Sequence, residues 1–324
     1  MNSTTEINHE KLMELFGSVF NDVAGSMAIM MSYLGDQTGV YRSMDKLGPA
    51  SVEEIAKESN VDERYLLEWL SSNSGRGYVT YHDDEEKFSL SPEQAAVFAR
   101  ENEPTCIQGL VQGVVGQFVK EDIAVDVFQT GRGRPWGEHH ECCFCGTERF
   151  FRPAYAGHLL DEWIPAMEGV EDKLKKGAKV ADIGCGLGTS SMLMAEQYPN
   201  STIHAFDFHG PSIDEAKKRG AEKGLDNLEF FVSDAAAIPN ESYDLACIFD
   251  AWHDMGDPVG VAKSIKDTLA DDGTFMVVEP MALDGLKNNI ENNPSSSMFY
   301  GFGTLICVPA CLLYTSDAAD ERNS

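Results

Sequence analysis

The sequence predicts an α/β protein in which a parallel sheet occupies the C-terminal half and a mainly helical domain precedes it. After Gly177, short apolar runs alternate with helical segments, the order that gives a parallel sheet covered by helices on both faces. Before that point, apolar residues recur mostly at intervals of three and four, which is the period of helices. A chain of 324 residues is long enough for both domains.

The first predicted helix spans residues 10–34. Its apolar side chains follow helical spacing, and they are Leu12, Leu15, Phe16, Phe20, Val23, Met27, Met30 and Met31. We expect this face to pack in a core or in a subunit interface, and contact with a ligand is the less favoured alternative.

Residues 38–90 are predicted to form three helices and then a two-stranded ribbon. Ser51 starts one helix with a capping box, and Asp62 starts the next. The apolar face of that next helix is expected to hold Leu66, Leu67 and Leu70, with Trp69 beside it.

This order of elements resembles a winged helix. Its recognition helix, residues 62–72, offers only Arg64 against three acids, which is unsuited to reading DNA. We therefore expect this domain to dimerise and to cover an active site. The candidate assembly is a homodimer formed through the N-terminal domain.

The segment between the two domains is predicted to be helical over residues 104–130 and to form a glycine-rich loop over 131–137. Cys142, Cys143 and Cys145 follow two histidines and could bind a soft metal. Because no second ligand pair occurs, we expect no metal, and a loop or helix start near the substrate instead. Residues 149–167 should form an aromatic-faced helix with Pro153 in its first turn.

The C-terminal half contains five predicted strands and three predicted helices. The strands are 179–183, 202–206, 228–232, 245–249 and 274–278, and the helices are 189–197, 211–223 and 258–270. In this architecture ligands bind at the carboxyl ends of the strands.

A glycine turn follows the first of these strands. Gly184, Gly186 and Gly188 lie at a spacing of two, where side chains would keep a ligand away from the backbone. Thr189 or Ser190 then begins a helix whose free N–H groups face the turn. Such a turn suits a nucleotide-like or carboxylate-bearing ligand, although the motif alone is a weak signal.

Acidic residues follow the later strands. Asp207 ends the second strand 23 residues after Gly184, a spacing at which a carboxylate accepts hydrogen bonds from ribose hydroxyls. Asp234 follows the third strand and could accept a hydrogen bond from an adenine amine. The fourth strand is followed by residues 250–257, which include His253.

Over about residues 177–280 the chain resembles the class I S-adenosylmethionine-dependent methyltransferases. The competing nucleotide class, NAD enzymes, usually has a G-x-G-x-x-G loop, whereas here the third glycine follows after one residue. The resemblance implies S-adenosylmethionine as cofactor and a small-molecule methyl acceptor. The implied cofactor-binding residues are Asp182, Gly184, Cys185, Gly186, Gly188, Asp207, Phe208, Ser233, Asp234, Ala235 and Asp250.

With the winged helix included, the chain resembles the small-molecule O-methyltransferases. That resemblance implies that His253 is the base that removes a hydroxyl proton, with Asp254 or Asp257 orienting it. A structural histidine is an almost equal alternative, and Asp254 fits a helix cap or core partner better than a catalyst. The cysteine cluster keeps the arsenite methyltransferases open as a minor class. Position alone gives the substrate-pocket candidates Trp136, Phe151, Tyr155, Trp252 and Met255.

The composition limits partners and location. A charge of −28, from 53 acidic and 25 basic residues, should repel nucleic acid. The absence of a signal peptide and of an uncharged run of about 20 apolar residues predicts a cytoplasmic protein without a membrane partner. The eight cysteines are then expected to be free thiols. The alternative function is a ligand-sensing winged-helix transcriptional regulator without methyltransferase activity.

The C-terminus departs from the methyltransferase pattern, which closes its sheet with two further strands. No such strands are predicted after Val278, and residues 311–321 resemble a translated sequencing-library adapter. We therefore expect a winged-helix domain over 1–100, a helical linker over 101–176, an incomplete methyltransferase domain over 177–310 and a non-native tail over 311–324. The missing strands would leave an unpaired sheet edge.

Overall fold

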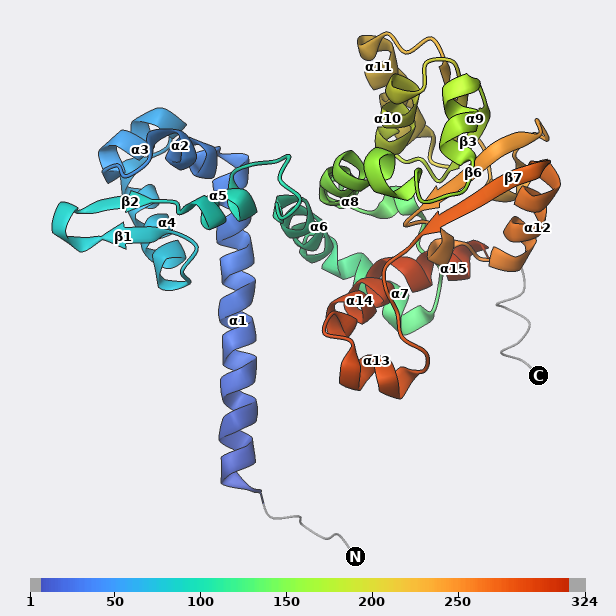
Figure 1. Ribbon diagram of the computed structural model, residues 1–324. Coiled ribbons are helices and arrows are strands. Elements are labelled where there is room, and N and C mark those ends of the chain that lie inside the picture. Colours follow the sequence, from blue (N-terminus) through green and yellow to red (C-terminus); the bar gives the residue numbers. More distant parts are fainter. Residues whose placement is uncertain (1–6, 315–324) are drawn as a thin grey trace, which may run out of the picture. The chain divides into compact units, whose positions relative to one another are not determined.

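The computed structural model describes residues 7–314, which form two compact units (Figure 1). The first unit runs to Val115 and takes in Cys145–Pro153. The second comprises Gly116–Phe144 and the chain from Ala154 onward.

The first unit contains the predicted three helices and ribbon. Its elements are α1 (His9–Gln37), α2 (Val40–Leu47), α3 (Val52–Ser59), α4 (Glu63–Gly75), β1 (Thr80–His82), β2 (Lys87–Ser89), α5 (Pro92–Phe98) and most of α6 (Gln108–Phe118). Strands β1 and β2 pair antiparallel, and a short 3-10 turn joins them. The order expected of a winged helix is therefore present.

The predicted caps begin α3 and α4. The Ser51 side chain accepts a hydrogen bond from the backbone N–H of Glu54, whose carboxylate accepts one from the Ser51 N–H. The buried face of α4 differs from the prediction, because Trp69 is 7% exposed and Leu67 is 42% exposed. The indole N–H of Trp69 donates to the Met31 carbonyl, and this contact turns the large ring inward.

Helix α1 keeps most of its predicted apolar face in solvent. Its buried residues lie near its C-terminal end, and they are Ala28, Ser32, Gly35 and Asp36. Of the predicted apolar residues, Met31 packs partly against the domain core. The others are exposed along the helix: Leu12, Leu15, Phe16, Phe20, Val23, Met27 and Met30. Packing of this face in the core of its own domain is therefore excluded for all but its last turns.

The second unit is built on a parallel sheet of five strands in the order β5-β4-β3-β6-β7. All five predicted strands are confirmed. The last begins earlier than predicted, at Leu269, and its register with β6 shifts between Tyr243 and Leu245. The strands are β3 (Lys179–Ile183), β4 (Thr202–Asp207), β5 (Leu228–Val232), β6 (Tyr243–Phe249) and β7 (Leu269–Val278). The helices before and between them are α7 (Glu121–Thr130), α9 (Val170–Lys176), α10 (Thr189–Gln197), α11 (Gly210–Lys223) and α12 (Pro258–Thr268).

The aromatic-faced helix begins earlier than predicted. Helix α8 (Glu141–Ala154) starts after His140, whose imidazole accepts the N–H of Cys142, and it continues into the π-helical segment η3 (Tyr155–Trp163). Pro153 therefore lies inside the helix and not in its first turn. A proline there removes one backbone hydrogen bond, and the wider π turn follows directly.

After β7 the described chain is helical. The elements are α13 (Leu286–Asn292), α14 (Ser296–Phe302), the π-helical η6 (Gly303–Cys307) and α15 (Val308–Tyr314). No strand follows Val278 in the part of the chain that the structure describes, as the sequence predicted. Most of the predicted non-native tail, residues 315–324, lies outside the described residues.

One helical stretch bears on the expectation that nothing spans a membrane. Among the described residues, Ser296–Leu313 is long and apolar enough to cross a bilayer by length and composition, and 22% of it is buried. Such a single helix is weak evidence for a span, and α15 contacts the 3-10 turn η5 (Trp252–Asp254) of the same unit.

Candidate functional site

The glycine turn connects β3 to α10 with all three glycines in the left-handed region, at φ values of +76°, +53° and +79°. A Cβ on Gly184 would lie 2.8 Å from the Cβ of Ala251, and one on Gly188 would lie 2.6 Å from the Phe230 ring. A Cβ on Gly186 would meet nothing within 4 Å. Gly184 and Gly188 are therefore required by packing, whereas Gly186 presents its backbone to open space.

Hydrogen bonds tie this turn to the end of β4. The N–H groups of Gly184 and Cys185 donate to the Phe206 carbonyl at 2.8 and 3.0 Å. The N–H of Gly186 donates to Oδ2 of Asp207 at 2.8 Å. The N-cap residue of α10 is Gly188, so no capping side chain competes with a ligand for the backbone N–H groups at the start of this helix.

Asp182 lies beneath the turn and is fully buried. Its Oδ2 accepts hydrogen bonds from the hydroxyls of Ser190 and Ser191, both at 2.6 Å, while its Oδ1 has no partner among the described residues. Burial raises the pKa of Asp182 to about 6, against the effect of the two serine hydrogen bonds. No pattern in the sequence predicts that these serines hold the carboxylate.

Asp207 reaches the turn as predicted. Its second oxygen, Oδ1, accepts the N–H of His209 at 2.8 Å. Burial raises the pKa of this carboxyl, and the hydrogen bonds from His209 and Gly186 oppose the rise. The neighbouring Phe208 is 49% exposed.

The segment after β5 lies against the same strand end. The N–H of Ser233 donates to the Asp207 carbonyl at 3.0 Å. Asp234 is exposed and uses Oδ1 to accept the N–H of Ala236 at 2.7 Å, so its other oxygen points to no described partner. Asp207 and the segment 233–235 therefore occupy one edge of the sheet.

Asp250 follows β6 in a left-handed backbone conformation, φ +52°, which is uncommon outside glycine and often marks a functional position. Its N–H donates to the Val278 carbonyl at 2.8 Å. Burial raises the pKa of Asp250 to about 7, with further increases from Glu279 and Asp254 and an opposing effect of His253.

Glu279, which the sequence reasoning missed, organises the segment after Asp250. Its Oε1 accepts the N–H groups of Ala251 and Trp252 at 3.2 and 2.7 Å, and its Oε2 contacts Nδ1 of His253. The signal was available, because Glu279 directly follows a predicted strand just as Asp207 and Asp234 do.

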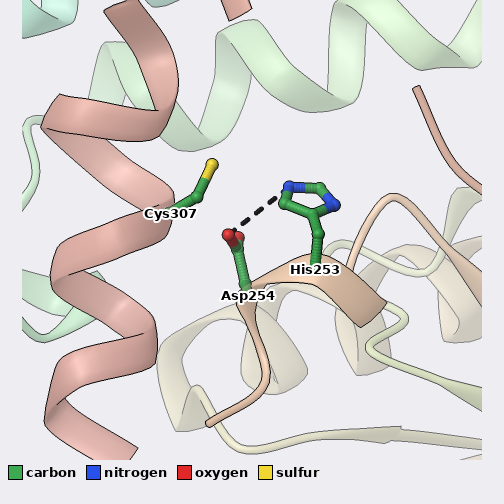
Figure 2. A group of neighbouring side chains, drawn as sticks. All are labelled: His253, Asp254 and Cys307. Carbon is green, nitrogen blue, oxygen red and sulfur yellow. Dashed lines mark ion pairs between the residues drawn. The ribbon is translucent and has the colours of Figure 1, made fainter. Parts of the chain in front are cut away.

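The other nitrogen of His253 faces Asp254 and Cys307 (Figure 2). Nε2 lies 3.4 Å from Oδ1 of Asp254. Burial lowers the pKa of His253, but hydrogen bonds with Cys307 and Glu279 and the charge of Asp254 outweigh it and raise the pKa to about 11. The imidazole is therefore protonated near neutral pH.

Two donor sets at this point could hold a metal ion by atom type and spacing. They are His253 with Asp254 and Cys307, and His253 with Asp250 and Glu279, each with ligand atoms within 4.8 Å of one another. Cys307 comes from η6, in an apolar stretch to which the sequence assigned no function. Asp257 does not orient His253, because its carboxylate caps α12 through the N–H of Gly260 at 2.8 Å.

The substrate-pocket candidates lie in different surroundings. Trp136 packs on Phe144 with ring centres 5.3 Å apart, and Tyr155 lies 5.4 Å from the Phe249 ring at the end of β6. Trp252 and Met255 pack partly against the core cluster beside β6. Phe151 belongs to the first unit, unlike these four residues.

None of the eight cysteines forms a disulfide in the described structure. Cys142 and Cys143 are buried at the start of α8, and burial raises the pKa of Cys143 to about 11. A thiol with that pKa is neutral near pH 7, whereas metal binding requires the thiolate. A cavity of about 440 Å³ near α13 is lined by residues of 284–292 and by none of the predicted site residues.

The sheet order, the glycine turn and the acids at successive strand ends define a class I methyltransferase fold preceded by a winged-helix domain. Family comparison agrees with both parts. Residues 174–316 match the family described as Methyltransferase domain, and residues 25–100 match the Rv2258c-like winged HTH domain. The chain therefore carries a methyltransferase domain behind an N-terminal winged helix-turn-helix domain.

Individual relatives are distant. The sequence is 28% identical over 176 residues to the sterol 24-C-methyltransferase erg-4 of Neurospora crassa, which covers 53% of this chain and 43% of that enzyme. The matched part thus spans less than half of that relative's length.

Two solved structures share the fold over most of their length. The mitomycin 7-O-methyltransferase MmcR has a TM-score of 0.65 at 15% identity, covering 93% of this chain and 88% of that one. Human N-acetylserotonin methyltransferase, solved in complex with SAM, has a TM-score of 0.64 at 14% identity, covering 94% and 88%. At these identities the likeness shows the fold.

Proposed function

We propose that this protein transfers a methyl group from S-adenosylmethionine to a hydroxyl oxygen of a small-molecule acceptor. The observation that carries the proposal is the open backbone at Gly186, held by Asp207 at the ligand edge of a methyltransferase sheet. The solved structure of the human enzyme with SAM, which shares this fold, supports the choice of cofactor.

The residues around the turn fit this cofactor. The backbone at Gly186 can be approached closely, and Asp182 has an oxygen left to accept a hydrogen bond. We assign the methionine end to residues 182–188, including Cys185, and the ribose and adenine to Asp207 and Asp234. Phe208, Ser233, Ala235 and Asp250 flank these groups. The bound cofactor supplies a methyl group already activated on a sulfonium, so the chain's main task is to align the acceptor with it.

We propose that His253, whose imidazole lies at the same sheet edge, removes the proton from the acceptor hydroxyl. With a pKa of about 11 the resting imidazole is protonated and cannot accept a proton near pH 7. A sulfonium cation bound nearby disfavours a second positive charge and lowers this pKa. The base role therefore depends on prior binding of the cofactor.

Calorimetry with S-adenosylmethionine tests the cofactor, and labelled methyl transfer to a panel of phenols, acids and amines tests the reaction. Asp207→Ala should abolish binding. His253→Ala should keep cofactor affinity and lose turnover, while His158→Ala, the matched control on η3, should keep both. A folded wild type without cofactor affinity would refute the proposal, and an active His253→Ala variant would refute only the base.

We also propose a homodimer formed through the N-terminal domain, supported by the apolar face of α1. Phe16 and Phe20 are 61% and 67% exposed, and their rings stack with centres 6.3 Å apart. A contiguous apolar face of this kind is typical of an interface. The double change to glutamate should give a monomer in light scattering after size exclusion, whereas Lys11→Glu should not. A monomeric wild type at micromolar concentration would contradict this.

The alternative function, a ligand-sensing regulator, gains support from the winged helix-turn-helix match. The charge of α4 argues against it, because Arg64 pairs with Glu68 at 2.6 Å and is surrounded by acids. We expect no retention of DNA in a gel shift at low salt, where electrostatic binding is strongest. Salt-sensitive retention would favour the regulator. A cytoplasmic location is proposed in keeping with eight cysteines that form no disulfide among the described residues.

A further inference from the structure

The glycine-rich loop before α8 contains a buried guanidinium without a counter-charge. Arg134 is 1% exposed, and its side chain makes one long hydrogen bond, from NH2 to the Glu138 carbonyl at 3.4 Å. Its Nε has no partner, and no carboxylate lies within ion-pair distance among residues 7–314. Arginine remains charged under all ordinary conditions, so this site has a net positive charge.

The nearest candidates for a counter-charge are already engaged or neutral. The Glu138 carboxylate pairs with Arg132 at 3.3 Å, and Arg132 also pairs with Asp126 at 2.6 Å. Cys143, the other close group, is a neutral thiol because burial raises its pKa to about 11. The positive charge of Arg134 therefore has no counter-charge within ion-pair distance among the described residues. Glu138 and Asp122 act on it only from further away, and burial lowers the pKa of the guanidinium.

His139 adds a second unused polar group beside Arg134. It is 5% exposed, and its Nδ1 has no partner in the described part of the chain. Burial, together with the charge of Arg134, lowers the pKa of His139 to about 4, so the imidazole is neutral near pH 7. A neutral imidazole can donate one hydrogen bond from the ring nitrogen that carries its proton.

The segment that carries these two residues contacts the cofactor edge and the helical stretch that contains Cys307. On one side, the Cβ position of Gly137 is 3.5 Å from Nε2 of His209, whose N–H donates to Asp207. On the other side, the Arg134 N–H donates to the Pro309 carbonyl at 3.0 Å, two residues after Cys307. A group bound at Arg134 would thus lie within the unit that holds the candidate active site.

A charge buried without a partner costs a protein stability, because it loses its hydration and gains no counter-charge. A carboxylate would remove that cost, because it matches the planar guanidinium and accepts two hydrogen bonds at once. An uncharged acceptor could accept hydrogen bonds from the guanidinium but would supply no counter-charge. The chemistry of the site therefore favours an anionic ligand over a neutral one.

We propose that Arg134, with His139, binds the carboxylate of the methyl acceptor, which makes the acceptor class a small hydroxy acid. This inference rests on the proposed methyl transfer. Arg134 is enclosed in this structure, so binding of an anion requires the loop of residues 131–137 to separate from α15, which it contacts through Gly133 and Leu313.

Calorimetry with paired probes tests the proposal in the full chain. The probes are 4-hydroxybenzoate, salicylate and 3-hydroxybutyrate, each compared with its amide. We expect at least one acid to bind ten-fold or more tightly than its amide, and Arg134→Gln to remove that preference. Arg64→Gln, which removes an exposed arginine from α4, is the control for the loss of one positive charge and should bind as the wild type does.

Stability separates a lost site from a lost fold. Because Arg134→Gln removes an unpaired buried charge, its melting temperature should equal or exceed that of the wild type. Should Arg134→Gln fail to fold, Arg134→Lys keeps the charge without the planar fork and should weaken acid binding. Equal affinity for every acid and its amide, or unchanged acid binding in the arginine variants, would overturn the proposal. S-adenosylmethionine is titrated in parallel. If the cofactor binds but no acid is preferred over its amide, only the carboxylate site is refuted; if the cofactor does not bind, the methyl-transfer proposal fails.

Discussion

Replacing Asp182 by asparagine should change how stability depends on pH. The carboxyl has a pKa of about 6 in the folded protein, against 3.8 for the free group. An acid whose pKa is raised on folding binds more protons in the native state between these values, so stability falls as the pH rises through that window. The full effect is the 2.2-unit difference multiplied by 1.36 kcal/mol, or about 3 kcal/mol above pH 6.

About 1.4 kcal/mol of this effect should develop between pH 5 and pH 8, with the rest below pH 5. Urea unfolding of the wild type and of Asp182→Asn across that range gives the difference between their unfolding free energies at each pH. The change of this difference with pH measures the effect of the carboxyl. The difference should move in favour of the variant as the pH rises. Asp284→Asn, which removes an exposed carboxylate, controls for net charge. A flat difference across this range would refute the burial argument for Asp182.

Two further predictions concern the turn and the histidine. Gly188→Ala should destabilise the protein by roughly 2–4 kcal/mol, since its Cβ would meet the Phe230 ring in a left-handed backbone, whereas Gly186→Ala should cost about 1 kcal/mol and mainly weaken cofactor binding. Thermal melts and calorimetry compare the two, and equal destabilisation would contradict the assignment. Glu279→Gln should lower the pKa of His253 by about 1 to 3 units in an NMR titration, because the negative charge at Nδ1 is lost; an unchanged pKa would show that Glu279 does not hold the proton.

The strands and the glycine turn could be predicted because their signals are local. A run such as Val180–Ile183 followed by alternating glycines depends on neighbours in the chain, and the acids after successive strands follow from parallel topology. The face of α4 was less predictable, because Leu67 and Trp69 are both apolar and, two residues apart, point to nearly opposite sides of the helix. The contact of Trp69 with the Met31 carbonyl, far away in sequence, decides which one is buried.

The residues that contact His253 could be identified only from the folded structure. Glu279 reaches it because β7 pairs with β6, and Cys307 reaches it because η6 lies against η5, pairings that no sequence period encodes. The position of Pro153 likewise followed from a helix start at His140 that precedes the aromatic pattern.

Local patterns along the chain were enough to predict the class of domain, the turn that can hold the cofactor and the acids near that turn, because each depends on backbone conformation within a few residues. Tertiary structure decided the protonation of His253 and Asp182 and the isolation of the Arg134 charge. Those properties depend on burial and on charges brought together from distant segments, and the surrounding dielectric and counter-charges exist only once the chain has folded.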